Sequence, residues 1–492
     1  MSPTKSARSE AALVRKGSAP GRHVYDAIVI GGQLGGALSA ALLARRGLQT
    51  LYVPHDGLGE KYQFQGHALP HAPFLMPPLK SVPAFDEALH ELGLTQAVSR
   101  MLHAVPLQLL ETDRWFDLSH DEKHRGPELA RALGDGAEAF DELVRKAQAA
   151  GDASDTFFQA KTEFPPEGFF GKWKFKRSLS AHPGLPTDTP LEKESLVRRL
   201  ELFVSSTETS APLTRARVIG RTLGGPVVHD GGREGLWAQL IERARELGAD
   251  VLSADEAVER LSFDATPGVR LTRGDTIYRA GIVLAAMDLD VLTRLVPEKQ
   301  QKAATKLNVA APQKAIVSFH FILPESALPR GLGRLALLHA PKLEGGVALV
   351  EVQPGPTPQQ RTLTASVQAP VGLRAGGEPA VRALAQQVHA SLERVMPFTK
   401  PHITAESSPW IDAQPVVAAR GEPHPLFSLP GEAWLGVAGL TTSSPWKRVL
   451  MAGRQVLPGL GFEGEILAAQ RAVKVAEAVL KKNDPLKQRR SA

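Results

Sequence analysis

The sequence predicts an α/β protein in which a doubly wound parallel sheet is interleaved with a second, α+β domain. Two observations carry this prediction. A strand, a glycine-rich turn, a helix and a second strand follow one another near the beginning of the chain, and a strand, several glycines and a helix recur near its end. A glycine-started helix followed by strands lies between them. One sheet would therefore collect segments from the beginning, middle and end of the chain.

The N-terminal unit begins with an apolar, β-branched run from His23 to Ile30, which is typical of a buried parallel strand. The turn 31–36 follows, and the helix-forming run 37–46 ends at Gly47. Residues 48–53 read as the second strand. Such a βαβ unit places the N-terminus of its helix against the pyrophosphate of a dinucleotide. The sequence thus predicts a Rossmann-like, FAD/NAD(P)-binding domain.

Three positions depart from the residues that a dinucleotide requires. Gln33 stands at the middle glycine position, where a side chain either collides with the pyrophosphate or turns its amide toward it as a donor. Pro54 stands where an acidic residue accepts from the ribose, and Asp56 is the nearest substitute. Near the C-terminus, Arg454 follows Gly453 and can only donate hydrogen bonds.

Three more segments carry a family resemblance: Leu58–Lys61 with Gly66, the helix Gly231–Gly248 with the strands up to Asp288, and Val449–Gly464 with the helix that follows. With the N-terminal unit, they resemble the superfamily that contains phytoene and carotenoid desaturases and the flavin amine oxidases. In that superfamily an aspartate at the Arg454 position accepts from the ribityl chain of FAD. The resemblance implies these cofactor-binding residues: Gly31, Gly32, Gln33, Gly36, Asp56, Lys61, Val258, Gly453, Arg454, Gly459, Gly461 and Gly464.

Two functions follow from these observations. The resemblance implies an FAD-dependent oxidoreductase, of desaturase or amine oxidase type if active, that acts on a largely apolar small molecule. Because glycines are costly unless the backbone needs them, the retained glycines suggest that a cofactor still lies against these turns. The alternative is a descendant that binds flavin weakly or not at all, because of Gln33, Pro54 and Arg454, and serves as a ligand-binding or protein-interaction scaffold. No residue is nominated as catalytic.

The predicted domain boundaries follow the same segments. The dinucleotide-binding domain takes residues 23–85, 225–300 and 425–480, and a substrate or cap domain takes residues 86–224 and 301–424. Strands at 315–323, 347–352 and 362–369 and an amphipathic helix at 378–396 are expected in the latter half of the cap domain. Residues 1–22, a disordered tail, and 481–492 flank the two domains.

The amino-acid composition excludes several classes of function for this protein. The chain has 492 residues and no cysteine, which excludes disulfides, thiolate metal sites and a cysteine nucleophile. Of the net charge of +6, each terminal tail carries +4, so residues 23–480 carry −2. A slightly acidic body argues against nucleic-acid binding. Without a signal peptide or a long apolar run, a cytoplasmic protein is expected, with a candidate peripheral contact at the inner face of the membrane.

That contact is predicted in residues 164–177, which hold five aromatic and four basic residues. One interpretation is a membrane-facing segment, in which aromatic rings enter the bilayer interface and lysines meet anionic head groups. The other is a cap segment whose aromatic rings pack inward. The residues assigned to membrane or substrate access are Phe169, Phe170, Trp173 and Lys174.

Two pairs of histidines have a spacing that can bind a metal ion. His120 and His124 have the i, i+4 spacing that chelates a metal on one helical face, but a third ligand is missing from the sequence nearby. His67 and His71 share this spacing, and Pro70 argues against a regular helix there. We therefore expect no metal site.

Overall fold

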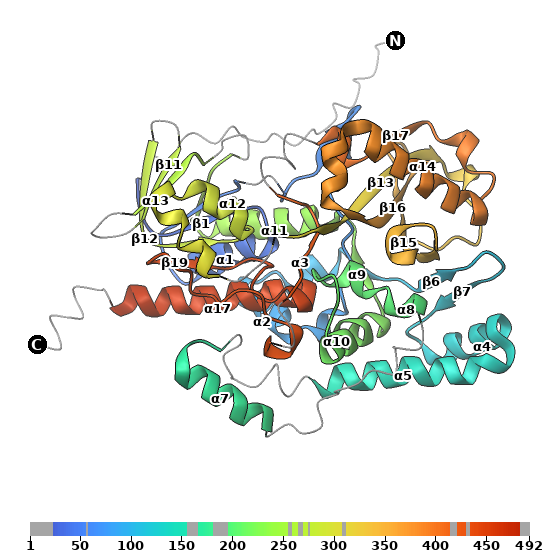
Figure 1. Ribbon diagram of the computed structural model, residues 1–492, viewed down its shortest axis with the longest axis horizontal. Helices are drawn as coiled ribbons and strands as arrows, with labels where there is room; N and C mark the ends of the chain where they lie inside the picture. Colours follow the sequence, from blue (N-terminus) through green and yellow to red (C-terminus); the bar gives the residue numbers. More distant parts are fainter. Residues whose placement is uncertain are drawn as a thin grey trace, which may run out of the picture.

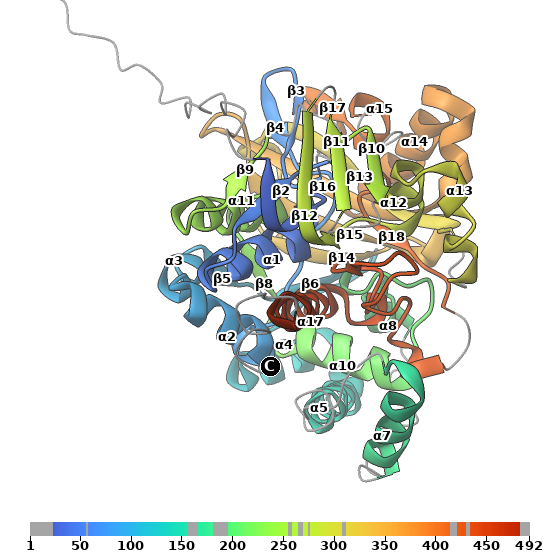
Figure 2. The same cartoon turned by 90° about the vertical axis from the view of Figure 1, so that its left-hand side faces the viewer.

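The computed structural model describes residues 23–55, 58–154, 166–180, 195–253, 258–263, 269–273, 276–307, 311–413, 421–429 and 433–482. These residues form two sheets with helices packed around them (Figures 1 and 2).

The first sheet contains seven strands in the order β10-β11-β12-β1-β2-β9, with β19 also paired to β12. Its inner strands run parallel: β1 pairs with β2 and β12, and β12 pairs with β19. Strands β10 and β11 add an antiparallel edge. The bounds are β1 Val24–Ile30, β2 Thr50–Val53, β9 Asp250–Val251, β10 Arg260–Phe263, β11 Val269–Arg273, β12 Thr276–Ala285 and β19 Val449–Met451.

Three helices cover one face of this sheet. Helix α1 (Leu34–Arg45) packs between α11 (Gly232–Glu246) and α17 (Gly461–Lys482). Residues 34–44 of α1 are all buried, which explains why the helix is apolar around its whole circumference. The helix ends at Gly47, whose φ of 81° only glycine adopts readily.

The second sheet contains eight strands in the order β17-β13-β16-β15-β14-β6-β7, with β18 paired to β13. It is antiparallel except for the parallel pair β14 and β6. Its strands are β6 Leu107–Leu110, β7 Trp115–Leu118, β13 Lys314–Pro324, β14 Leu335–His339, β15 Val347–Pro354, β16 Gln360–Pro370, β17 Ala405–Ser407 and β18 Pro425–Leu426. Helix α14 (Gly377–Val395) packs on this sheet (Figure 1).

The remaining elements connect these layers. Two short antiparallel pairs are the hairpin of β3 (Tyr62–Phe64) with β4 (His67–Leu69) and the long-range pair of β5 (Leu102–Ala104) with β8 (Val227–His229). The other helices are α2 Pro83–Leu92, α3 Thr95–Ser99, α4 Glu122–Leu133, α5 Ala137–Ala153, α7 Gly168–Ser180, α8 Ser195–Arg198, α9 Glu201–Val204, α10 Pro212–Leu223, α12 Leu289–Leu295, α13 Glu298–Gln301 and α15 Pro409–Asp412.

The structure confirms the predicted fold class. The parallel sheet gathers strands from the beginning, middle and end of the chain, and a second, mixed sheet with its own helices stands beside it. The first helix begins at Leu34, three residues before the predicted start, because the glycines at positions 35 and 36 belong to its first turn. Positions 1–22 and 483–492 lie outside the described residues.

The segment that holds His120 and His124 is the start of a helix. Because α4 begins at Glu122 with Asp121 as its N-cap, the two histidines do not share one helical face. The Asp121 side chain accepts from the Lys123 N–H and the His124 ring instead. Among the described residues, three or more metal-ligating side chains nowhere gather into a group.

Candidate functional site

The candidate site lies where β1, β12 and β19 end, beside the N-terminus of α1. The turn after β1 is tightly held: Gly31 has a φ of 117°, and its carbonyl accepts from the Tyr52 hydroxyl at 2.6 Å. Trp237 of α11 donates to the same hydroxyl at 2.9 Å. Carboxyl ends of parallel strands are where this class of sheet binds ligands, so this is the expected place for a dinucleotide.

Gln33 and Arg454 both donate hydrogen bonds here to Asp288, a residue to which the sequence analysis assigned no role. The Gln33 amide nitrogen donates to Asp288 Oδ1 at 3.0 Å, and its oxygen accepts from the Arg454 backbone N–H at 2.9 Å. The Arg454 guanidinium forms a fork with both oxygens of Asp288, at 3.1 and 2.7 Å. All three side chains are buried. The two departures from the cofactor pattern are thus partners in one hydrogen-bonded network, which we call the strand-end network.

Arg454 extends this network to the second domain. Its guanidinium donates to the backbone carbonyls of Glu422 and Pro423, at 2.6 and 2.5 Å. The Glu422 carboxylate in turn accepts from Trp410 at 3.0 Å and pairs with Arg374 at 2.7 Å. Burial raises the pKa of Glu422, and Arg374 opposes that shift. Arg454 is therefore a structural cation and not a free group that awaits a phosphate.

The N-terminus of α1 is occupied by a carboxylate of the chain itself. Glu465, on the first turns of α17, accepts from the Gly35 N–H at 2.9 Å. Both its oxygens also accept from Arg233 of α11, at 2.9 and 2.8 Å. A helix N-terminus favours an anion because its first N–H groups lack helical partners. Glu465 supplies that anion at the position where a pyrophosphate would lie.

A second buried ion pair lies at the same end of α17. Arg217 of α10 forms a fork with Glu463, at 2.8 and 2.6 Å, and donates to Ser154 at 2.6 Å. The Arg217 side chain is 1% exposed and that of Glu463 10% exposed. The helix that the resemblance places against the flavin therefore begins with two acidic side chains, each neutralised by an arginine from another helix.

The retained glycines are explained by the protein's own atoms. A Cβ at Gly31 or Gly36 would overlap Ala286, one at Gly453 would overlap the Gln33 side chain, and one at Gly464 would overlap the Leu457 carbonyl. Likewise Gly459 lies against the Gly436 carbonyl, and Gly461, with a φ of 53°, lies against the Val204 carbonyl. Close chain-to-chain packing therefore requires glycine at these positions whether or not a cofactor lies against the turns, and the retained glycines are not evidence for one.

We expect Gly453→Ala to lower the free energy of unfolding by about 1 kcal/mol or more, because the methyl group displaces the Gln33 amide from its buried partners. Denaturant unfolding measures this loss. Adding Gln33→Gly should recover part of it, since the clash disappears with the side chain. Gly331→Ala is the matched control, because a Cβ there meets open space. Additive effects of Gln33→Gly and Gly453→Ala would contradict the packing explanation.

The adenine end of the predicted site is also altered. Val258, which the resemblance assigns to the cofactor, donates its N–H to Nδ1 of His55 at 3.0 Å. His55 follows Pro54 at the end of β2, and both are buried. Asp56, the proposed substitute for the ribose acceptor, lies outside the described residues, whereas Gly32 lies buried in the turn after β1.

Lys61 lies near a different group of side chains. It is half-buried and lowers the pKa of Glu234, which burial raises. The Glu234 carboxylate accepts from the His71 backbone at 3.3 Å, and burial lowers the pKa of the His71 ring to about 4. Among the described residues Lys61 forms no ion pair. Its assignment to a phosphate stays a prediction.

These contacts test whether FAD fits. Between α17, Arg233, Arg454 and the 72–75 and 203–206 segments, the described residues leave a cavity of only about 50 Å³. Pockets that bind organic ligands usually have about 300–1,000 Å³. This cavity does not fit FAD in the present arrangement: Glu465 and Gln33 stand where the resemblance places the pyrophosphate, and Arg454 stands where it places the ribityl acceptor.

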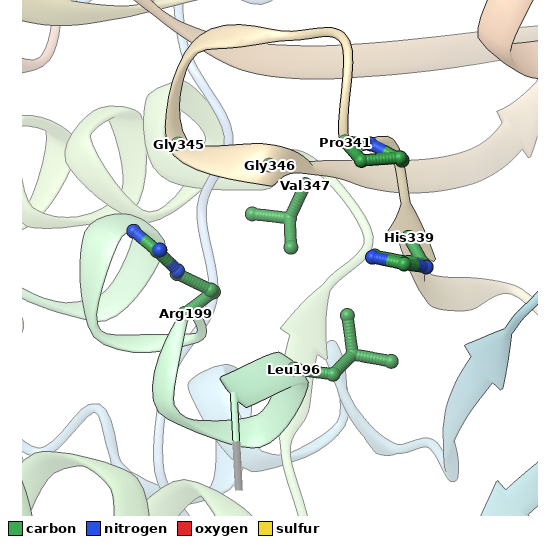
Figure 3. Close-up of a pocket in the computed structure, with 7 residues that line it drawn as sticks. All are labelled: Leu196, Arg199, His339, Pro341, Gly345, Gly346 and Val347. Atoms are coloured by element: carbon green, nitrogen blue, oxygen red, sulfur yellow. The ribbon is translucent and has the colours of Figure 1, made fainter. Parts of the chain in front are cut away.

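A larger hollow, of about 360 Å³, lies elsewhere (Figure 3). Leu196 and Val347 face one another across it, with Arg199 and His339 on opposite sides. Its lining combines the Arg199 guanidinium and the His339 imidazole with apolar groups and backbone, and it shares no lining residue with the cavity beside Arg233 and Arg454. This hollow is not the predicted dinucleotide site.

The residues assigned to membrane access all lie on α7. Phe169 and Phe170 are each 79% exposed and Trp173 is 53% exposed, and Lys174 is exposed as well. The alternative that these three rings pack inward is therefore wrong; Phe175, 4% exposed, is the ring of this helix that packs inward. None of the described helices has both the length and the apolar composition needed to cross a bilayer.

Taken with the two sheets, this arrangement is the fold of the flavin amine oxidases. Several solved structures share it. An oxidoreductase from Methanosarcina mazei superposes with a TM-score of 0.58 at 13% identity, covering 91% of this chain and 100% of its own. Putrescine oxidase bound to putrescine gives 0.58 at 14% identity, covering 92% and 99%.

Cyclohexylamine oxidase from Brevibacterium oxydans gives a TM-score of 0.55 at 15% identity, covering 94% of this chain and 99% of its own. No protein-family model matches the sequence, and no curated protein matches it either. At these identities the likeness establishes the fold, and the superfamily resemblance in the sequence agrees with it.

Several residues that shape the site escaped the sequence analysis: Asp288, Glu465, Arg233 and His55. Asp288 was visible as the acidic residue after an apolar strand, and Glu465 as an acidic residue just after the last glycine-rich turn. Their partners come from positions 166 to 430 residues away, and only the tertiary structure brings these together.

Proposed function

We propose that the protein is a cofactor-free member of this fold that works as a binding scaffold. The observation that carries this proposal is the capping of the α1 N-terminus by Glu465, because an anion of the chain stands where the pyrophosphate of a dinucleotide would bind. The strand-end network supports it from the other side of the turn. For FAD to enter, Glu465 would have to leave Arg233, and Gln33 would have to leave Asp288.

Opening these contacts for FAD costs a large amount of free energy. Separating a buried ion pair costs about 3–5 kcal/mol, and each 1.4 kcal/mol weakens binding about tenfold. Opening the Glu465–Arg233 pair lowers FAD affinity by at least about two powers of ten, and breaking the Gln33–Asp288 hydrogen bond lowers it further. A site that began at nanomolar affinity would become micromolar or weaker.

The second candidate is an FAD-dependent oxidoreductase that acts on a largely apolar small molecule, similar to phytoene desaturases. The fold favours it, since the structures that superpose on the chain include oxidases. A βαβ unit with a buried helix N-terminus also remains in place. This candidate requires the Glu465–Arg233 ion pair and the Gln33–Asp288 hydrogen bond to open when the cofactor binds.

Flavin uptake separates the two candidates. We expect the protein as purified to show less than about one tenth of a flavin per chain by absorbance near 450 nm, and titration with FAD to give a dissociation constant of about 1 µM or weaker. The variant Gln33→Gly, Glu465→Gln should take up more FAD than the wild type, because it removes the Gln33 side chain and the negative charge of Glu465 that would repel the pyrophosphate. A yellow wild-type protein with close to one flavin per chain would overturn the scaffold proposal and support the oxidoreductase.

A further inference from the structure

Helix α7 presents an exposed aromatic face that no described residue covers. Among the described residues six large apolar side chains are exposed, and three of them, Phe169, Phe170 and Trp173, lie within five positions on this helix. Exposed apolar residues are ordinary when scattered singly, whereas a cluster marks a surface that meets another apolar phase. Figures 1 and 2 show α7 at the rim of the molecule, apart from both sheets.

The geometry of the helix separates an anchored side from a free side. At about 100° per residue, Phe169, Phe170 and Trp173 fall within roughly 100° of one another around the axis, and Phe175 points in nearly the opposite direction. Phe175 is 4% exposed, so it lies on the covered side of the helix. The other three rings therefore lie on the outward side.

The start of the helix is fixed to the rest of the fold. Glu167, just before α7, accepts from the Ser443 hydroxyl at 2.6 Å and from the Ser443 N–H at 3.2 Å. It also lies 3.5 Å from Arg471 of α17. The aromatic face thus has a defined orientation relative to the dinucleotide-type domain.

The charges around this face are of one sign. Lys172, Lys174, Lys176 and Arg177 are exposed, and α7 contains no acidic residue. By the same helical spacing, Lys172 and Lys176 border the aromatic face on one side, and Lys174 borders it on the other. Arg177 stacks over the Trp173 ring at 5.8 Å.

An aromatic stripe bordered by lysines on both sides matches the interface of an anionic bilayer. The rings reach the boundary between acyl chains and head groups, and the ammonium groups snorkel to the phosphates. An apolar protein groove would satisfy the rings but would leave the flanking cations without complementary charge.

We propose that α7 docks the protein on membranes that contain anionic phospholipids. Phe169, Phe170 and Trp173 enter the interface, and the four basic residues contact lipid phosphates. The proposal goes beyond the scaffold function and does not depend on whether the protein binds FAD.

Vesicle cosedimentation of the full-length protein tests this docking. At about 0.15 M salt, we expect binding to vesicles with about 30% phosphatidylglycerol and at least tenfold weaker binding to pure phosphatidylcholine. The variant Phe169→Ser, Phe170→Ser, Trp173→Ser should bind the anionic vesicles at least about tenfold more weakly. Phe398→Ser is the matched control, because Phe398 is 81% exposed elsewhere on the surface and should not affect binding.

The basic tails give an alternative source of binding, and the triple variant distinguishes it. If that variant binds anionic vesicles as well as the wild type does, the tails or another surface carry the interaction and the proposal is wrong. Failure of the wild type to bind either vesicle would overturn it too, and would leave a protein partner as the occupant of this face. Because the three side chains are exposed, the melting temperature of the variant should stay close to that of the wild type.

Fluorescence locates the contact. Lipids brominated on their acyl chains should quench part of the tryptophan emission of the bound protein, and Trp173→Phe should abolish that quenching while the protein still sediments with vesicles. Quenching that persists in Trp173→Phe would place another tryptophan in the bilayer and contradict the assignment to α7.

Discussion

Replacing Arg454 by methionine is expected to lower the free energy of unfolding by about 3–5 kcal/mol. The guanidinium is the main partner of the Asp288 carboxylate, whose side chain is 5% exposed. Without Arg454, a buried charge keeps one hydrogen bond, from Gln33. Two backbone carbonyls of the neighbouring segment also lose their donor. Denaturant unfolding monitored by circular dichroism measures the effect.

Two further variants show whether the effect comes from the buried network. Arg382→Met removes an arginine that is 57% exposed and pairs with Glu378 one helical turn away, so it should cost no more than about 0.5 kcal/mol. The double variant Asp288→Leu, Arg454→Met should recover part of the loss, because no unpaired charge remains buried. An Arg454→Met loss as small as that of Arg382→Met would mean that the strand-end network does not form.

His320→Gln is expected to make the protein less sensitive to acid. Burial lowers the pKa of His320 to about 3, and the ring is fixed as neutral: Nε2 donates to the Pro70 carbonyl at 3.0 Å, and Nδ1 accepts from Thr364 at 2.9 Å. In the unfolded chain its pKa is about 6.5. The unfolded state therefore takes up a proton as the pH falls through 6.5, the folded state does not, and stability is lost.

The size of this loss follows from linkage. Between pH 7 and pH 5, one such histidine costs about 2 kcal/mol of unfolding free energy. In His320→Gln that decrease should be smaller by this amount, whatever the variant's absolute stability. Unfolding curves at the two pH values measure the difference.

Glu351→Gln should shift the pH dependence in the opposite direction. Burial raises the pKa of Glu351 to about 7, so the folded state takes up a proton that the unfolded state does not bind until about pH 4.5. Acidification from pH 7 to pH 5 therefore stabilises the wild type through this group by about 2 kcal/mol, and the variant should lack that gain. Equal pH dependence in the wild type and both variants would show that neither group is buried as the structure places it.

Much of the fold was predictable because its signals are local. The strand from His23 to Ile30, the glycine turn and the helix after it lie within one short segment, and their pattern specifies a βαβ unit. The strands and the helix of the second domain likewise followed from apolar spacing within single elements.

The roles of the site residues could not be predicted from the sequence around each of them. Gln33 and Arg454 each looked like a defect in a cofactor pattern, and the retained glycines looked like evidence for the cofactor. Whether the two residues face a phosphate or one another depends on three strands meeting at one edge of the sheet. Asp288 makes them partners, and it comes from the end of the strand that lies between theirs.

The sequence by itself determined that the chain forms a discontinuous, doubly wound domain joined to a second sheet, because apolar periodicity and glycine turns act over a few residues. It also located the aromatic and basic segment of α7. Only the tertiary structure decided that Glu465 caps the first helix and that three aromatic rings of α7 face outward. Both outcomes depend on which distant side chains become neighbours, since burial and charge pairing are properties of the assembled fold.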